Sequence, residues 1–148
     1  MNNTVLANVA RGIGAGLAAT AAMSATLGIA YKVKTIDRQP PQLIVDAFLP
    51  DIPERENRVF AAIAHFGYGT AASIGYAVVL PRIVRGVTTG TGYGALVWLV
   101  GYEGWLPLMG ILPPAHRDDL RRVGTMFAAH LVFGSVLGFA LRRRLTAG

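Results

Sequence analysis

The stretch HFGYGT at residues 65–70 returns as HLVFGS at residues 130–135. Each reads histidine, two further residues, an aromatic residue, glycine and then a small hydroxyl residue. Each is also preceded by a glycine-rich stretch, GIGAGL at 12–17 and GTGYGA at 90–95. The order GxGxG and then HxxΦG(S/T) therefore occurs twice, which predicts a chain built from two similar halves.

The composition indicates a membrane protein. Of the 148 residues, 53% are hydrophobic and only 15% are charged, which is too apolar for a small soluble domain with its large surface. The absence of cysteine excludes disulfides, a thiolate nucleophile and a cysteine-ligated metal. The net charge of +6 resides in basic residues at the ends of apolar runs, as in membrane flanks. We therefore expect a lipid bilayer as partner and no nucleic acid.

Four stretches are long enough to cross a bilayer, whose core of about 30 Å requires about 20 apolar residues in a helix. Each should be helical because unpaired backbone groups are not tolerated in lipid. The first stretch also has features of a signal peptide, but its length and its place in the repeat favour a retained helix. The four predicted spans are Val5–Tyr31, Arg58–Leu80, Thr89–Ile111 and Leu120–Leu141.

The long connection after the first span contains the apolar segment QPPQLIVDAFLP, residues 39–50. Pro40 and Pro41 suit the start of a helix, and Pro50 ends the run. The segment is too short to span a bilayer. It predicts either a short interfacial helix on the bilayer surface or an ordered loop packed on the helix ends.

Two spans per half give both halves the same orientation in the membrane, which is a parallel repeat. The sequence thus predicts an all-α integral membrane protein with one membrane domain over residues 1–148. Repeat 1 covers about 5–80 and repeat 2 about 89–141. Both termini then share one side, which carries Arg11, Arg82, Arg85 and Arg142–Arg144 and no acid. That distribution predicts cytoplasmic termini.

The glycine pattern has a packing interpretation. A dinucleotide site is excluded because no strand precedes GxGxG and no acidic residue follows about 20 positions later. Small residues four apart instead make flat helix faces on which backbones approach closely. The expected packing residues are Gly12, Gly16, Gly90, Gly94, Gly134 and Gly138.

Three ionisable residues are expected at a similar depth on three different spans: His65, Glu103 and His130, with Tyr68 and Tyr102 close by in sequence. Ionisable groups within a membrane usually face a partner or a cavity. Four residues after Glu103, Pro107 has no N–H to donate to the Glu103 carbonyl. The third span should therefore kink there.

Four interpretations of this cluster remain open. Glu103 could bond the histidines and tyrosines and so fix helix register. The three groups could form a proton or solute pathway, or a metal site of two histidines and one carboxylate. The two histidines, His65 and His130, could also hold haem. We predict the first, with no metal, no cofactor and no catalytic residue.

Several segments together resemble the YagU-like family of uncharacterised bacterial inner-membrane proteins. They are PPQLIVDAF at 40–48, HFGYGTAASIGY at 65–76, PLMGILPP at 107–114, and His130 in the last span. The resemblance implies a multi-pass protein of the bacterial inner (cytoplasmic) membrane and no established catalytic residues.

These observations predict a non-enzymatic protein, a structural or accessory subunit of a membrane assembly that is a homo-oligomer or a larger complex. A small transporter or proton-conducting protein using the His/Glu cluster is the first alternative. A membrane metal or haem protein is the second.

Overall fold

The computed structural model describes residues 3–36 and 38–142, and this part of the chain contains helices and no strand. The elements, in chain order, are α1 (Asn3–Lys32), α2 (Pro40–Phe48), α3 (Glu54–Val79), η1 (Arg82–Val84), α4 (Val87–Leu99), the π-helical η2 (Val100–Trp105), α5 (Leu106–Leu108), η3 (Ala115–Arg117) and α6 (Leu120–Leu141).

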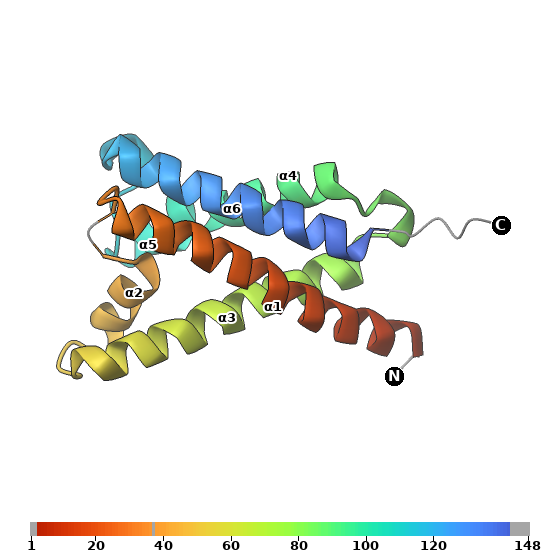
Figure 1. Cartoon of the computed structure of the whole chain (residues 1–148), viewed down its shortest axis with the longest axis horizontal. Helices are drawn as coiled ribbons and strands as arrows, with labels where there is room; N and C mark the ends of the chain where they lie inside the picture. The colour runs from red at the N-terminus through yellow and green to blue at the C-terminus, as the bar shows by residue number, and fades with distance from the viewer. Residues whose placement is uncertain (1–2, 37, 143–148) are drawn as a thin grey trace.

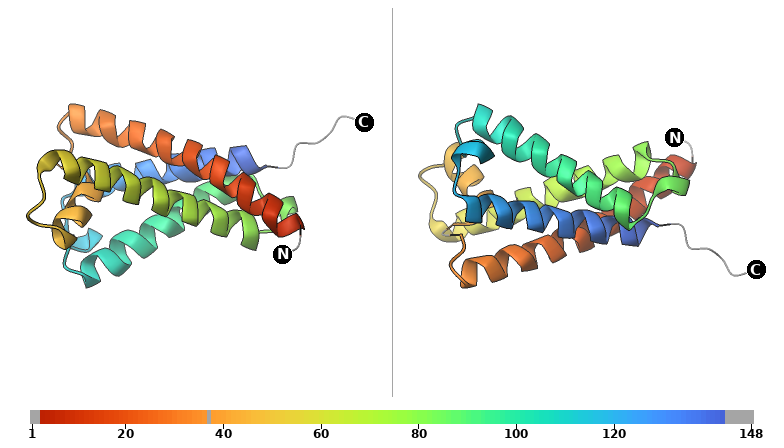
Figure 2. Two further views of the ribbon diagram at one scale, coloured as in Figure 1. Left: turned by 90° about the horizontal axis from the view of Figure 1, so that it is seen from below. Right: turned by 90° about the horizontal axis from the view of Figure 1, so that it is seen from above.

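Four long helical segments run along one axis, and the short α2 lies at the end of the bundle opposite to the start of α1 (Figure 1). The closest helix pairs are α1 with α3, α4 with α6, and α1 with α6. Side chains connect α3 to α4: the Tyr76 and Thr89 hydroxyls lie 3.0 Å apart, and the Tyr93 hydroxyl donates to the Ala72 carbonyl at 2.7 Å. Two tyrosine side chains thus connect α3 to α4, and Figure 2 shows the ribbons of these two helices.

Two of the helices, α1 and α6, are each long and apolar enough to cross a membrane. α1 lies between α3 and α6 and buries Ala19 and Leu27 almost completely. It is therefore an integral part of the packed bundle.

Glycines bring the backbones of α4 and α6 into direct contact. A Cβ atom on Gly94 would overlap the carbonyl oxygen of His130, and one on Gly90 would overlap that of Gly134. In the other direction, a Cβ on Gly134 would overlap the Gly90 carbonyl, and one on Gly138 the Gly86 carbonyl. Because the obstacles are backbone atoms, no side-chain rotation can relieve the overlap.

The crossing of α1 and α3 has a similar construction. Gly12 lies against the backbone of Ile74, and Gly16 lies against Thr70 and the Ser73 side chain. Gly69, the glycine of the motif HFGYGT, was not among the expected packing residues, yet it faces Thr20 so closely that a Cβ there would overlap the threonine hydroxyl. All six glycines expected at helix contacts lie at one of the two crossings.

The helix boundaries mostly follow the sequence. The fourth expected span, Leu120–Leu141, matches α6, and the Asp119 carboxylate caps it by accepting from the backbone N–H groups of Arg121 and Arg122 at 3.0 and 3.1 Å. α1 and α3 extend a few residues beyond the expected starts. Within the described residues, no side-chain hydrogen bond caps the start of α3, which follows Pro53.

The third expected span ends earlier than Ile111. Its last helical element stops at Leu108, and Gly110 adopts a φ of +69°. The Gly110 N–H donates to the Pro107 carbonyl and the Ile111 N–H to the Leu106 carbonyl, both at 3.0 Å. This is a Schellman ending, which requires a left-handed residue and so favours glycine.

The same helix widens into a π-helix over Val100–Trp105, where the kink was expected. Gly104 leaves the helical region with φ −99° and ψ −105°, and the Leu106 N–H bonds to the Gly101 carbonyl five residues earlier. Pro107 follows directly and offers no N–H. A proline and a flexible glycine together account for the irregular turn.

We predict that Gly94→Ala lowers the free energy of unfolding by about 1–3 kcal/mol, because the new methyl group forces α4 and α6 apart. Thermal unfolding of the purified full chain would measure the change. The matched control is Gly92→Ala, two residues away, where a Cβ meets nothing within 4 Å. The control should be stabilised by about 0.5–1 kcal/mol through the loss of a helix-interior glycine. Equal effects of the two substitutions would contradict the close approach.

Candidate functional site

A cavity of about 330 Å³ lies in the half of the bundle that carries α2. All four long helical segments contribute to its wall, and α2 covers it with Pro40, Pro41 and Ile44. We call it the central cavity. Its wall is mainly apolar and includes Met23, Leu27, His65, Tyr68, Tyr102, Trp105, Leu106, His130 and Phe133.

The cavity follows from where the helices cross. The glycine contacts of α4 with α6 involve residues near the start of α4 and the middle and end of α6. From there the ribbons of both helix pairs diverge toward the α2 end (Figures 1 and 2). Larger side chains, such as Met23, Trp105 and Phe133, fill only part of the widening space. The close contacts at one end therefore create room at the other.

Two polar atoms at the cavity have no partner within the described part of the chain. They are Nε2 of His65 and Oγ1 of Thr20, and both are buried. A buried polar atom without a hydrogen bond costs about 1–3 kcal/mol. These atoms distinguish the cavity from an ordinary packing defect, which would be lined by carbon alone.

The tautomer of His130 can be assigned from its contact. Its Nδ1 lies 2.8 Å from the carbonyl oxygen of Met126. A carbonyl only accepts, so Nδ1 carries the hydrogen, and Nε2 of the neutral ring is an acceptor. His65 and His130, one from each copy of the repeated motif, thus line one cavity, and His130 offers an acceptor nitrogen.

The two tyrosines expected in the cluster also line the cavity. The Tyr102 hydroxyl donates to the carboxylate of Asp118, which also pairs with Arg122 at 3.2 Å. Tyr68 places its ring 6.4 Å from that of Trp105 and is about half exposed. Tyr102 therefore ties the cavity wall to the turn before α6.

Glu103 does not join the two histidines, contrary to the sequence interpretation. It is absent from the cavity wall, and its carboxylate lies 3.8 Å from Nδ1 of the exposed His116. The interpretation compared only depth along the helices. Gly101 and Trp105, four residues apart, share the face toward the cavity, and a residue midway between them points away. The depth of a residue along its helix does not predict its partners unless the face of the helix on which it lies is also known.

The described residues contain no group of three or more histidine, aspartate or glutamate side chains that could hold a metal ion. The candidate set of His65, Glu103 and His130, one of the alternatives left open by the sequence, is therefore not assembled as three ligands. Only the two imidazoles remain together at the cavity.

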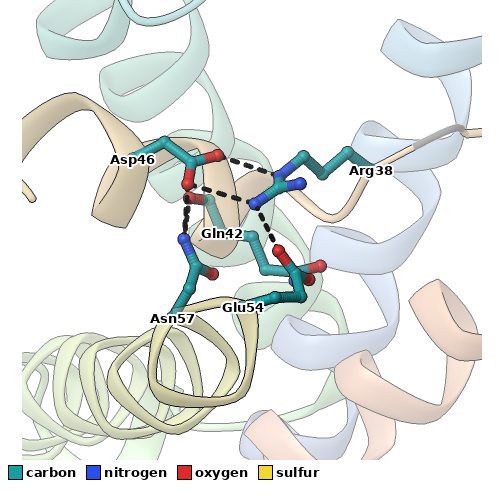
Figure 3. A network of polar contacts seen from close by, with 5 residues as sticks. All are labelled: Arg38, Gln42, Asp46, Glu54 and Asn57. Atoms are coloured by element: carbon teal, nitrogen blue, oxygen red, sulfur yellow. Dashed lines mark hydrogen bonds and ion pairs between the residues drawn. The ribbon is translucent and has the colours of Figure 1, made fainter. Parts of the chain in front are cut away.

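A polar network holds α2 over the cavity (Figure 3). Arg38 pairs with Asp46 of α2 at 2.9 Å and with Glu54 of α3 at 3.1 Å. Asn57, which is 1% exposed, donates to the Asp46 carboxylate at 2.6 Å and to the Gln42 carbonyl at 3.3 Å. The Gln42 side chain donates to Glu54 at 3.0 Å. The sequence offered one signal for this network, the lone acid Asp46 within the apolar run LIVDAF.

The fold and the cavity define a small all-helical protein with two helices suited to cross a membrane and a mainly apolar cavity between its helices. The chain belongs to a family of unknown function, DUF6789, which matches residues 6–147. No curated protein and no solved structure matches the chain. The resemblance to YagU-like proteins is not tested by these comparisons and stays a prediction.

We predict that Asn57→Ala detaches α2 from α3. The substitution removes two hydrogen bonds, one of them to a carboxylate, and should lower the free energy of unfolding by about 1–3 kcal/mol. Hydrogen exchange of the amides at 43–48 should accelerate more than that of α6. The neighbouring Arg58, exposed and without a hydrogen-bond or ion-pair partner among the described residues, provides the control Arg58→Ala. Unchanged exchange in α2 of the Asn57 variant would show that the network does not hold it.

Proposed function

We propose that the chain is a four-span integral protein of the bacterial inner membrane, in which α3 and the run from α4 to α5 cross the bilayer together with α1 and α6. The 26 residues of α3 rise about 39 Å and the run from Val87 to Leu108 about 33 Å, enough for a hydrocarbon core of about 30 Å. His65 and several glycines make α3 less apolar than α1 or α6. Of these, His65 lines the cavity, and Gly69 and Gly75 face Thr20 and Tyr93 of neighbouring helices.

The strongest support for four spans is the outer surface of the bundle. Every long helix exposes large apolar side chains. Together these side chains make the outer surface of the bundle apolar on every long helix, whereas a soluble protein exposes only scattered apolar residues. They include Ile13, Leu17 and Ile29 of α1, Phe60, Ile63 and Val79 of α3, Leu96 and Leu99 of α4, and Phe127 and Phe139 of α6.

The glycine contacts support the proposed parallel repeat. Gly12 and Gly16 of α1 lie against Ser73 and Thr70 of α3, and the equivalent Gly90 and Gly94 of α4 lie against Gly138 and Gly134 of α6. In motif register, Ser73 corresponds to Gly138. Two hairpins with the same crossing and the same orientation would arise from one duplicated unit.

The distribution of charged residues between the two ends of the bundle supports cytoplasmic termini. Arg11, Arg82, Arg85 and Arg142 lie at the end of the bundle where α1 begins and α6 ends. Arg143 and Arg144, which the sequence interpretation also used, lie outside the described residues. All the acidic residues of the chain fall within 37–56 and 103–119. The arginines at this end form compact clusters without an acidic residue, and this clustering supports a cytoplasmic location of the termini.

We further propose that the protein has no catalytic activity of its own and acts as an accessory subunit that holds a small apolar molecule in the central cavity. The observation that carries this proposal is the pair of unpaired, buried polar atoms, His65 Nε2 and Thr20 Oγ1, within a mainly apolar wall. Binding sites for small molecules combine an apolar lining with a few such groups.

The cavity chemistry narrows the ligand class. Because Nε2 of His130 accepts and Nδ1 is already used, a ligand with a hydroxyl or N–H donor would satisfy it. An apolar body would suit the aliphatic and aromatic wall. The only observation that supports the transport alternative and the metal or haem alternative is the presence of two imidazoles at the cavity. Glu103, the third group that both alternatives considered, lies away from the cavity wall.

Single cysteines would test the number of spans, because the chain contains none of its own. Asp51→Cys lies between α2 and α3, and Ile83→Cys lies in the exposed connection between α3 and α4. In intact inner-membrane vesicles, we expect an impermeant thiol reagent to label the two positions from opposite sides.

If only α1 and α6 crossed the membrane, residues 33–119 would share one side and both cysteines would be labelled from it. That outcome would contradict four spans. Thr125→Cys, within α6, serves as the unlabelled control in both arrangements.

We predict that Val97→Trp fills the central cavity and expels its ligand. Native mass spectrometry of protein released from its own membranes should show a bound small molecule in the unsubstituted chain and its loss in this variant. The matched control is Leu96→Trp, the adjacent residue, which is about half exposed on the outer surface and should keep the molecule. A chain that carries no small molecule, or a Val97→Trp variant that retains it, would refute ligand binding here.

A further inference from the structure

A second pocket lies at the opposite end of the bundle from α2 and is lined mainly by arginines. Its volume is about 670 Å³, and its wall contains Arg11, Arg82, Arg85 and Arg142 together with the apolar Ile83 and Leu141. The four guanidinium groups come from α1, η1, the turn after η1, and the end of α6. We call it the arginine pocket.

Arg85 forms the buried base of this pocket and is only 6% exposed. Its Nε donates to the Leu80 carbonyl at 2.9 Å, and its Nη2 donates to the carbonyls of Leu80 and Ala77 at 2.7 and 2.6 Å. These carbonyls end α3, so Arg85 caps that helix and interacts favourably with its dipole. All its partners are neutral, and its positive charge is not cancelled by a carboxylate among the described residues.

Arg82 is held in a similar way. Asn8 of α1, which is itself buried, accepts from Nη2 of Arg82 at 3.2 Å and from Nη1 of Arg85 at 3.5 Å. One neutral amide oxygen thus orients two guanidinium groups. Burial and the adjacent charge of Arg82 lower the pKa of Arg85 below its usual value, as expected for cations that repel one another.

The other two arginines of the pocket, Arg11 and Arg142, have guanidinium N–H groups available to a ligand. Arg11 is exposed and has no hydrogen-bond or ion-pair partner among the described residues. Arg142 lies over the ring of Phe139, with its central carbon 3.9 Å from the ring centroid. Every ion pair of the described residues lies at the other end of the molecule, with Asp46, Glu54, Glu103 and Asp118.

We propose that the arginine pocket binds a phosphate group. Four cations around one pocket, without an acid, are stabilised by an anion that accepts several hydrogen bonds at once. The planar guanidinium matches phosphate oxygens in pairs. The apolar Ile83 and Leu141 beside the arginines suit the acyl chains of an anionic phospholipid, and basic pockets between membrane helices on the cytoplasmic side recognise such headgroups. A free phosphate group offers the same oxygens.

The test uses the full chain in detergent and a pocket variant that carries Arg11→Gln and Arg142→Gln. Arg82 and Arg85 stay unchanged because they hold the connection after α3. The control variant carries Arg117→Gln and Arg121→Gln, two exposed arginines near the start of α6 at the opposite end. It loses the same charge. Circular dichroism checks folding, and Arg11→Gln alone replaces the double variant if that variant does not fold.

Three probes are titrated and their binding is followed by the rise in Tm: phosphatidylglycerol, the zwitterionic phosphatidylcholine, and inorganic phosphate. We expect phosphatidylglycerol to bind the unsubstituted chain and the control at least about tenfold more tightly than the pocket variant. The preference should weaken with added salt.

The probes also separate the two sources of phosphate. Selective binding of phosphatidylglycerol identifies a lipid headgroup, and equally tight, pocket-dependent binding of inorganic phosphate identifies a free anion. Both results support the phosphate site. The proposal is overturned if phosphatidylcholine binds as tightly as phosphatidylglycerol, or if the pocket variant binds every probe as tightly as the unsubstituted chain.

Discussion

The close approach of helix backbones at glycine residues is the constraint on which the rest of the structure depends. Gly90, Gly94, Gly134 and Gly138 place α4 and α6 so close that none tolerates a Cβ atom. At the crossing of α1 and α3, Gly12 lies against the Ile74 backbone, and Gly16 and Gly69 lie against the side chains of Ser73 and Thr20. In the proposed membrane location, where apolar burial between helices gains little, such contact surfaces supply the association. The crossing points therefore set how each hairpin is arranged.

The central cavity is a geometric consequence of these crossings. Helices that touch near one end and cross at an angle separate toward the other end, and side chains fill the space between them only in part. The widened end needs its own closure. The network of Arg38, Asp46, Glu54 and Asn57 provides it by fixing α2 to the start of α3. Packing at one end and polar bonds at the other thus enclose a mainly apolar space.

The two ends of the molecule differ in charge as well as in shape. The α2 end holds the ion pairs of the described residues, among them Arg38 with Asp46 and Arg122 with Asp118. The other end gathers arginines around neutral acceptors such as Asn8 and the last carbonyls of α3. Buried or clustered cations need compensation from dipoles or from bound anions. This asymmetry connects the proposed orientation in the membrane with the proposed phosphate site, since both arise from the same acid-free arginines.

The amino-acid sequence by itself determined the helical class, the approximate extent of the long helices and the irregular turn before Pro107. It left a short helix beginning at Pro40 and an ordered loop as the two alternatives for residues 39–50. These features depend on local composition, caps and turn residues, which act within a few positions along the chain. It also indicated the glycines of the crossings, because spacing four apart defines one helix face.

Only the tertiary structure decided which side chains meet. It brought His65 and His130 to one cavity and left Glu103 beside His116, because partners depend on the rotation of each helix about its axis as well as on depth. It likewise assembled the α2 network from residues within 38–57, and the arginine pocket from residues as far apart as Arg11 and Arg142. Such groupings follow from how the crossings orient whole helices, which no local pattern encodes.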